Sequence, residues 1–235
     1  MKILLNYSPN FSKKLRKIKD IKFIVFHYTG MQSEIESIKR LTNEKTKVSC
    51  HYLINRKGLI IQMVKDKNIA WHAGKSKWKN FINLNKLSLG IELVNKGHQF
   101  GYQNYTKKQI NSLISLCKKL KKKYRIKDEN FLGHSDIAPL RKADPGEKFP
   151  WKKLSKFKFG KWYHHKDFIA EKDKKKIEKI FFQNIKKLGY RYFNVQRRSN
   201  KDKKIIKSFQ QHYTPNNVTS KIDQKTFIIS QYLTN

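Results

Sequence analysis

The chain of 235 residues has little of three features that would each point to a class of protein. Its two cysteines, Cys50 and Cys117, are too few for a disulfide-stapled scaffold. Near the N-terminus only Ile3 to Leu5 are apolar in a row, whereas a secretory signal needs an apolar run of about 7–15 residues and a spanning helix about 20. We therefore expect no membrane span and, from this end of the chain, a cytoplasmic location.

Acidic residues are also scarce. The chain has 17 Asp and Glu against 54 Lys and Arg, so its formal net charge is +37. Such an excess predicts attraction to polyanions, which include nucleic acid, anionic lipid and acidic cell-wall polymers. The lysines are spread over the whole chain, however, which is equally typical of proteins from AT-rich genomes. Because a charge excess without a reader motif gives weak, salt-sensitive binding, we expect no specific nucleic-acid partner.

Strand and helix patterns alternate over the first two thirds of the chain. Residues 21–28 are apolar on both faces, as in a covered central strand. Residues 51–64 suggest two strands around a turn, and 87–95 a further strand with Ser88, Gly90 and Glu92 on one face. These patterns predict an α/β fold with a mixed central sheet flanked by helices.

Two capping boxes mark where helices begin in this region. Ser33 with Glu36 opens a helix whose predicted buried face is Ile35, Ile38 and Leu41. Thr106 with Gln109 opens a longer one, on whose apolar face Cys117 should be a buried thiol. A short strand at 130–137 then runs into a loop.

The last third of the chain has a different pattern. Residues 158–170 are basic and aromatic with no clear period, and helical segments follow. We therefore predict a first, α/β domain at 1–157, a linker at 158–170 and a small helical domain at 171–235, in a monomeric protein.

Three residues form a candidate metal site. His27 ends the first central strand, while His134 and Asp144 lie ten residues apart across a loop that can bring both onto one ion. Two imidazoles and a carboxylate are a zinc ligand set that leaves a fourth position for water, an arrangement typical of hydrolases. Lys142 lies two residues before Asp144, and the small neighbours of Glu92 on its strand face leave room for a substrate.

Five motifs occur in order and identify a family. They are "IVFHYTG", "VSCHYLINRKGLIIQMV", "IAWHAG", "LGIELVN" and "LGHSDIAPLRKADPGEKFPW", and they span much of residues 6–155. Together they closely resemble the type-2 N-acetylmuramoyl-L-alanine amidases, the AmiD and AmpD group related to peptidoglycan recognition proteins. The resemblance implies hydrolysis of the amide bond between N-acetylmuramic acid, or its anhydro form, and L-alanine in peptidoglycan or muropeptides, during cell-wall turnover or recycling.

The same resemblance implies roles for individual residues. One zinc ion per chain would be bound by His27, His134 and Asp144, with Glu92 and Lys142 as the catalytic pair. Cys50 could touch the metal, but as a fourth ligand it would displace the catalytic water. Residues of the "HYLI", "WHAG" and "IELVN" motifs would line the substrate cleft: His51, Trp71, His72 and Asn95. The histidines outside the motifs are expected at the surface: His98, His164, His165 and His212.

The C-terminal segment 205–233 resembles a peptidoglycan-binding helical domain. Phe209, Gln210, Ile222, Asp223 and Thr226 match that pattern, but the usual Gly is Ser220. A plain helical cap on the catalytic domain is the other interpretation. Because a wall-binding module is typical of a periplasmic enzyme, both compartments stay open. The alternative function is a protein that recognises muropeptides without cutting them, a class in which zinc ligands or the Glu/Lys pair are lost.

Overall fold

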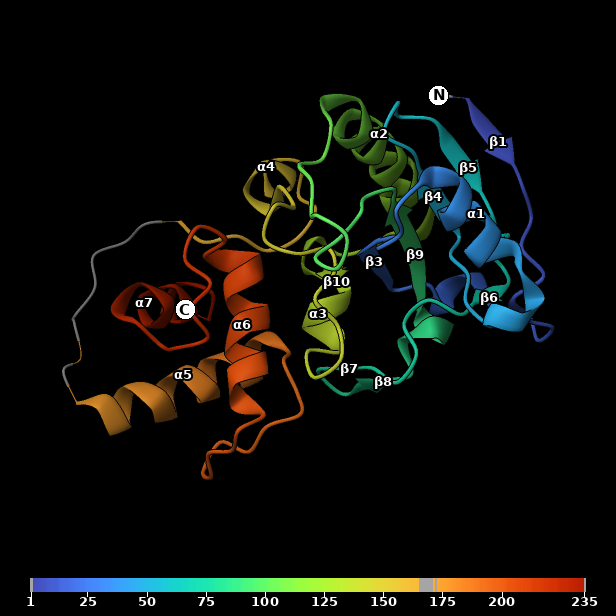
Figure 1. Ribbon diagram of the computed structural model, residues 1–235. Coiled ribbons are helices and arrows are strands. Elements are labelled where there is room, and N and C mark those ends of the chain that lie inside the picture. Colours follow the sequence, from blue (N-terminus) through green and yellow to red (C-terminus); the bar gives the residue numbers. More distant parts are fainter. Residues whose placement is uncertain (1, 165–170, 172, 235) are drawn as a thin grey trace.

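A six-stranded mixed sheet forms the centre of the computed structural model, which describes residues 2–164, 171 and 173–234 (Figure 1). The strand order is β1-β5-β4-β9-β3-β10; β4 and β5 are antiparallel, and the other neighbours are parallel. This confirms the predicted α/β class with a mixed sheet. The strands of this sheet are β1 (Ile3–Leu5), β3 (Phe23–Tyr28), β4 (Tyr52–Ile54), β5 (Ile60–Gln62), β9 (Ser88–Leu93) and β10 (Phe131–Gly133).

Shorter elements and the helices complete the fold. Two antiparallel ribbons pair β2 (Phe11–Ser12) with β6 (Ile69–Ala70) and β7 (Lys77–Trp78) with β8 (Phe81–Ile82). Short 3₁₀ turns lie at Ile18–Asp20, Glu44–Thr46, Leu84–Leu87 and Asp128–Asn130. The α-helices are α1 (Glu34–Thr42), α2 (Lys107–Tyr124), α3 (His134–Ile137), α4 (Trp151–Ser155), α5 (Lys174–Leu188), α6 (Asp202–Tyr213) and α7 (Gln224–Tyr232). Among the described residues no helix combines the length and the apolar composition that a membrane span requires.

Helix α1 begins where the sequence predicts, with a different pattern of hydrogen bonds. The Ser33 hydroxyl accepts from the Glu36 N–H, but the Glu36 carboxylate accepts from the N–H of Gln32 instead of closing the box on Ser33. Of the predicted apolar face Leu41 is buried and Ile38 half-buried, whereas Ile35 is 66% exposed. The prediction for Ile35 was wrong because α1 covers the sheet only with its C-terminal half.

Helix α2 covers one face of the sheet. Its capping box is complete, since Thr106 Oγ1 accepts from the Gln109 N–H and Gln109 Oε1 accepts from the Thr106 N–H. The predicted apolar face is buried in the main core, and Cys117 is a buried free thiol. Alternate strand residues such as Ile24 and Leu89 point into the same core. Burying one such aliphatic side chain contributes about 1.5–3 kcal/mol.

Helices α5 to α7 lie beside α3 at the β10 edge of the sheet (Figure 1). Phe23 and Val25 on β3 lie in one apolar cluster with Phe181, Phe209 and Phe227 of the three C-terminal helices. Because these helices complete a core that the sheet begins, they pack as part of the same body (Figure 1). Residues just after the predicted first domain take part in this packing. Phe159 is buried in the main core, and Trp162 packs against both cores. Residues 165–170 of the predicted linker lie outside the described residues.

The motif of the C-terminal module shapes the loop between α6 and α7. Gln210 Nε2 donates to the Lys221 carbonyl and to Thr226 Oγ1, and Gln210 Oε1 accepts from the Ser220 N–H. Asp223 caps α7 by accepting from the Thr226 N–H. Ser220 has a φ of 61°, a left-handed conformation that glycine adopts without strain, which explains why glycine is usual at this position.

A buried carboxylate joins three parts of the catalytic domain. Asp66 accepts hydrogen bonds from Tyr52 on β4 and from Tyr124 and Lys123 on α2. Burial opposes its ionisation, but these three donors outweigh burial and lower the pKa of Asp66. A carboxylate whose pKa is lower in the folded state stabilises the fold above its unfolded pKa of about 3.9 and loses that contribution as the pH falls.

We therefore expect Asp66→Asn to lower the free energy of unfolding at pH 7 by about 1–3 kcal/mol, because the donors lose a charged acceptor. The difference between variant and wild type should shrink as the pH falls below about 4, from the unfolded pKa through the lower folded pKa of Asp66. Urea unfolding at several pH values measures both effects. Asp128→Asn, at a half-exposed carboxylate paired with Lys121, is the matched control. A difference that stays constant with pH would contradict the assignment.

Candidate metal centre and catalytic cleft

A cleft of about 590 Å³ opens at the carboxyl ends of the parallel strands β9, β3 and β10. In parallel sheets this edge is where functional side chains gather, since each strand ends beside its neighbours. The polar residues that line the cleft include all five of the predicted metal and catalytic residues: His27, Glu92, His134, Lys142 and Asp144.

Strand register brings the two histidines together. His27 lies near the end of β3, and the parallel pairing places Gly133 of β10 beside Phe26. His134 follows Gly133 as the first residue of α3, so its side chain meets that of His27. The predicted strand at 130–137 was wrong for its second half, because residues 134–137 form the helical turn α3, closed by the Ala138 N–H on the His134 carbonyl.

Local contacts bring in Asp144 from the far end of the loop. The Ser135 N–H donates to the Asp144 carbonyl at 2.8 Å. Gly133 packs so closely on Pro145 that an added Cβ would lie 2.8 Å from its Cδ. A larger residue at 133 would therefore push Asp144 away from His134.

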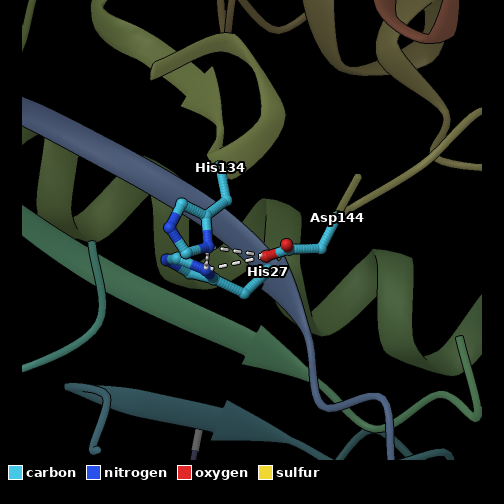
Figure 2. Close-up of side chains that lie close together, drawn as sticks. All are labelled: His27, His134 and Asp144. Carbon is cyan, nitrogen blue, oxygen red and sulfur yellow. Dashed lines mark hydrogen bonds and ion pairs between the residues drawn. The ribbon is translucent and has the colours of Figure 1, made fainter. Parts of the chain in front are cut away.

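Figure 2 shows the three side chains pointing toward one another. His27 Nδ1, His134 Nδ1 and Asp144 Oδ2 are each 3.0 Å from the other two. All three residues are buried. The geometry is compact enough for one ion, because ligand atoms at about 2.0–2.2 Å from a tetrahedral zinc lie roughly 3.3–3.5 Å apart.

The hydrogen bonds of the two Nε2 atoms indicate the tautomers of His27 and His134. Ser88 Oγ donates its proton to the Leu84 carbonyl, so it accepts from His72 Nε2–H. His72 Nδ1 is then an acceptor, and it receives the Nε2–H of His27 at 3.0 Å. On the other side His134 Nε2–H donates to the Ala73 carbonyl at 3.1 Å. Both Nδ1 atoms therefore present lone pairs.

Three acceptors thus meet with no hydrogen among them, an arrangement that fits a cation. The ionisation states agree with this. Burial, then the neighbouring His134, lowers the pKa of His27 to about 4. Burial opposes ionisation of Asp144, but the neighbouring His134 and His27 outweigh it, so the pKa of Asp144 is lowered. A neutral His27 beside an ionised Asp144 has the protonation states that metal binding requires.

Glu92 stands beside this group on the neighbouring strand. It is the register partner of His27 in the β3–β9 pair, so both side chains leave the same face of the sheet. Burial, followed by the charge of Asp144, raises the pKa of Glu92 to about 8. Its buried Oε2 has no hydrogen-bond partner among the described residues. A carboxyl group with such a pKa and an unused oxygen can exchange a proton near neutral pH.

Comparison with known proteins now decides the family. The family described as N-acetylmuramoyl-L-alanine amidase matches residues 17–147. The chain belongs to this amidase family. It is 34% identical to the N-acetylmuramoyl-L-alanine amidase AmiD of Escherichia coli strain K12, over 91% of this chain and 82% of AmiD. It is also 32% identical to the 1,6-anhydro-N-acetylmuramyl-L-alanine amidase AmpD of Haemophilus influenzae, over 62% of this chain and 86% of AmpD.

Solved structures agree with this assignment. A complex of E. coli AmiD with anhydro-N-acetylmuramic acid-L-Ala-D-gamma-Glu-L-Lys superposes with a TM-score of 0.79 at 30% identity, over 94% of this chain and 91% of AmiD. AmpDh3 of Pseudomonas aeruginosa gives the same TM-score and identity, over 94% of this chain and 93% of AmpDh3. Both matches extend through the C-terminal helices of this amidase.

Of the four predicted substrate contacts, one lines the cleft and three do not. His72 lines the cleft of the amidase, but its ring nitrogens are engaged by His27 and Ser88. It fills the space above Gly90, where an added Cβ would lie 2.4 Å from the imidazole. The room that we expected for substrate beside Glu92 is thus taken by a side chain that orients His27.

The other three predicted contacts lie outside the cleft lining. His51 is buried and bonded to Arg16 and the Gly90 N–H; burial, then Arg16, lowers its pKa to about 3. The Asn95 amide donates to the Gln103 carbonyl and accepts from the Gly97 N–H. Trp71 is half-buried, and its backbone N–H donates to Ser49 Oγ. Their buried polar groups already have protein partners, so their environment is that of structural residues.

Sequence reasoning missed two cations and misplaced one histidine. Arg40 of α1 and Arg141, in the loop between His134 and Asp144, also line the cleft. The signal for Arg141 was its place in the "PLRKADPG" motif. His212 was expected at the surface, but it is 3% exposed and stacks on Trp151. That prediction was wrong because a helix pattern cannot show which remote element covers a polar position.

Two further expectations concern smaller groups. His98 is exposed, as expected, and it is hydrogen-bonded to Tyr28 and Glu147. Cys50 is buried with its Sγ 3.9 Å from Met63 Sδ, and burial raises its pKa. The converging group of possible ligands in the described chain is His27, His134 and Asp144, without Cys50.

Removing one of the three candidate ligands should weaken metal binding by the amidase. We expect Asp144→Ala to lose most bound zinc on dialysis, because two imidazoles without the carboxylate form an incomplete site. Zinc should also raise the melting temperature of the wild type and not of the variant, since saturation to 100 times Kd adds about 2.7 kcal/mol. Elemental analysis and thermal unfolding measure this, with Asp128→Ala as control. Equal zinc content in both proteins would contradict a ligand role for Asp144.

Proposed function

We propose that this chain is a zinc-dependent amidase that cleaves the bond between the lactyl group of N-acetylmuramic acid, or its anhydro form, and L-alanine. The observation that carries the proposal is the meeting of three buried acceptors beside Glu92, whose raised pKa suits proton exchange. E. coli AmiD has been solved with an anhydro-muramyl peptide, and we infer a substrate of the same class here.

The donor set favours zinc among the possible metals. Two imidazole nitrogens and one carboxylate are a usual catalytic zinc ligand set, and three protein ligands leave a position open. The chemistry that zinc supplies when bound is Lewis acidity, which lowers the pKa of water to about 7 and polarises a carbonyl oxygen. His27, His134 and Asp144 would hold the ion, one per chain.

Glu92 would carry the proton transfers. As a carboxylate it removes a proton from the attacking water while the water oxygen bonds to the carbonyl carbon. The protonated Glu92 then delivers that proton to the amide nitrogen as the carbon–nitrogen bond breaks, which releases the amine of L-alanine. A pKa raised to about 8 before metal binding makes Glu92 a good proton donor in the second step.

Cations around the cleft would stabilise negative charge. Lys142 is exposed at the cleft wall beside Asp144, where its ammonium group can approach the carbonyl oxygen that becomes negative. Arg40 and Arg141 line other parts of the same cleft. The stem peptide bound to E. coli AmiD includes a D-gamma-Glu residue. We infer that Arg40 binds a carboxylate of such a peptide, because the Arg141 guanidinium already donates to the Ala73 and Lys75 carbonyls.

Glu92→Gln is the decisive variant for the enzyme function. It keeps the size of the side chain and removes proton transfer, so we expect release of peptide from anhydro-muropeptide to fall by about 10²–10⁴-fold. Zinc content should stay at the wild-type level, because Glu92 is not one of the proposed ligands. Chromatography of products measures turnover, and Glu44→Gln at an exposed site is the control. Near wild-type turnover would remove Glu92 from the mechanism.

The alternative function, recognition of muropeptides without cleavage, predicts a different behaviour of the wild-type protein. Wild type would then bind muropeptide and release no peptide at any zinc concentration. The presence of all five site residues in one cleft supports the enzyme. Comparing products from intact sacculi and from purified anhydro-muropeptides shows which of these two substrates the enzyme cleaves.

We further propose that residues 171–235 form a module that binds peptidoglycan. The resemblance rests on the loop around Gln210, Ser220 and Asp223. The hydrogen bonds of this loop hold α6 and α7 together and do not identify a ligand. Deleting the module would remove part of the apolar cluster that contains Phe23 and Val25 of the sheet, so a test by truncation would disturb the first domain. The test therefore needs the whole chain.

Hydrogen exchange with the Glu92→Gln chain on insoluble sacculi tests the module without cleavage. We expect slower exchange in peptides from α5 to α7 as well as in the cleft. The effect should persist at about 0.5 M salt, where the Debye length falls to roughly 4 Å and the general attraction of a +37 chain is screened. Protection confined to the cleft would favour a plain helical cap.

A further inference from the structure

The segment that carries two of the three proposed ligands is held by a single helix from the C-terminal module. Residues 134–147 run from α3 through a mostly irregular loop to Glu147, with His134 and Asp144 inside it. Helix α6 contacts this segment near its start, its middle and its end. The contacts come from His212, Lys204 and Gln211, and each is a side-chain hydrogen bond.

The first contact lies two residues after His134. Asp136 is 1% exposed, and its Oδ2 accepts from His212 Nδ1 at 2.8 Å and from the Gly133 N–H at 2.7 Å. Its Oδ1 accepts from the Tyr190 hydroxyl at 2.5 Å. A carboxylate buried this completely needs such donors. Two of the three come from the C-terminal module, and the third is the backbone of the residue before His134.

His212 is fixed in turn by its own packing. Its ring stacks on Trp151 with centroids 3.7 Å apart and an interplanar angle of 12°. Trp151 also packs against Phe26, the neighbour of His27. Because a carboxylate only accepts, His212 must donate from Nδ1. The orientation of this donor is therefore set by a stacked ring rather than by a mobile side chain.

The second contact lies three residues after Asp144. Glu147 Oε2 accepts from Gln211 Nε2 and from His98 Nε2, each at 3.0 Å. His98 Nδ1 accepts from the Tyr28 hydroxyl at 2.9 Å. Burial opposes ionisation of Glu147, but these donors outweigh it and lower the pKa of Glu147 to about 2. The end of the ligand loop is thus tied to α6 and, through His98, to the residue after His27.

The third contact lies between the two ligands. Lys204 Nζ donates to the Leu140 carbonyl at 3.0 Å, two turns before His212 on the same helix. Together the three bonds fasten the loop to one rigid element at residues 136, 140 and 147. Loops are usually the most mobile parts of a fold, and a metal site needs its ligands held to within about 0.5 Å.

We propose that α6 positions the metal-ligand loop, with His212 and Gln211 as positioning residues for His134 and Asp144. The inference rests on the proposed metal centre. It makes the C-terminal module part of the hydrolytic apparatus in addition to any role in binding the wall. Partners that orient ligands from outside the metal site typically change metal affinity by about 10–100-fold when they are removed.

The experiment compares two substitutions of one residue in the full chain. His212→Phe keeps a ring on Trp151 and removes the donor to Asp136, whereas His212→Asn keeps a donor near the position of Nδ1. We expect His212→Phe to bind zinc about 10–100-fold more weakly and to exchange amide hydrogens faster in peptides from 134–147. In the cobalt-loaded variant the visible absorption band should shift and broaden. His212→Asn should restore most of the affinity.

Two further variants keep the test open if His212→Phe does not fold. Gln211→Leu and Lys204→Met each remove one donor, and their double variant should weaken zinc binding by a similar factor. Lys203→Met, at an exposed lysine of the same helix, is the matched control and should change nothing. Wild-type zinc affinity and loop exchange in the double variant would overturn the proposal. Equal losses in His212→Phe and His212→Asn would also overturn it, since packing alone would then explain them.

The wild-type protein separates this inference from the proposed function. If wild type binds no zinc and releases no peptide, the metal centre itself is wrong. If wild type does both and the α6 variants match it, only the positioning role fails. With saturating zinc we expect the kcat of His212→Phe to stay lower than that of the wild type while KM changes little, because a misplaced ligand affects the reacting atoms more than the remote binding contacts.

Discussion

The structure of the cleft depends on three lone pairs that meet at one point. Two Nδ1 atoms and one carboxylate oxygen lie 3.0 Å apart with no hydrogen to share. Such a group is unfavourable in the interior of a protein unless a cation occupies it, because buried acceptors without donors lose the hydration that they have in water. The surrounding residues fix the lone pair of His27 in this position: Ser88 fixes the tautomer of His72, and His72 fixes that of His27.

The sheet explains why such an unfavourable group can persist. Parallel register sets His27 beside Glu92 and brings the end of β10 next to both. Register in a sheet buried on both faces is strongly specified, because a slip of one residue would turn Phe23 and Val25 away from their core. The energy that holds the ligands together is therefore apolar burial at the other end of the same strands, some distance from the chemistry.

Much of this site could be predicted from sequence, and the remainder could not for physical reasons. His27, Glu92, His134, Lys142 and Asp144 lie in the motifs that resemble the amidase family, and that resemblance predicted that they form one site. The surroundings of His51, Asn95 and His212 depend on partners far away in the chain, such as Arg16, Gln103 and Asp136. No periodicity encodes those partners. For the same reason Gly90 suggested open space, whereas the structure fills it with His72.

The C-terminal helices extend this dependence across the predicted domain boundary. A module that only bound the cell wall would need a solvated interface with the catalytic domain, as is usual between domains that move. Here the helices complete the apolar core of the sheet, and consecutive residues of α6 bond to both ends of the ligand loop. Motion between the two parts would break the bonds of Asp136 and Glu147 together. The catalytic geometry and the docking of the module therefore form one cooperative unit, and a change that loosens the docking also loosens the proposed metal site.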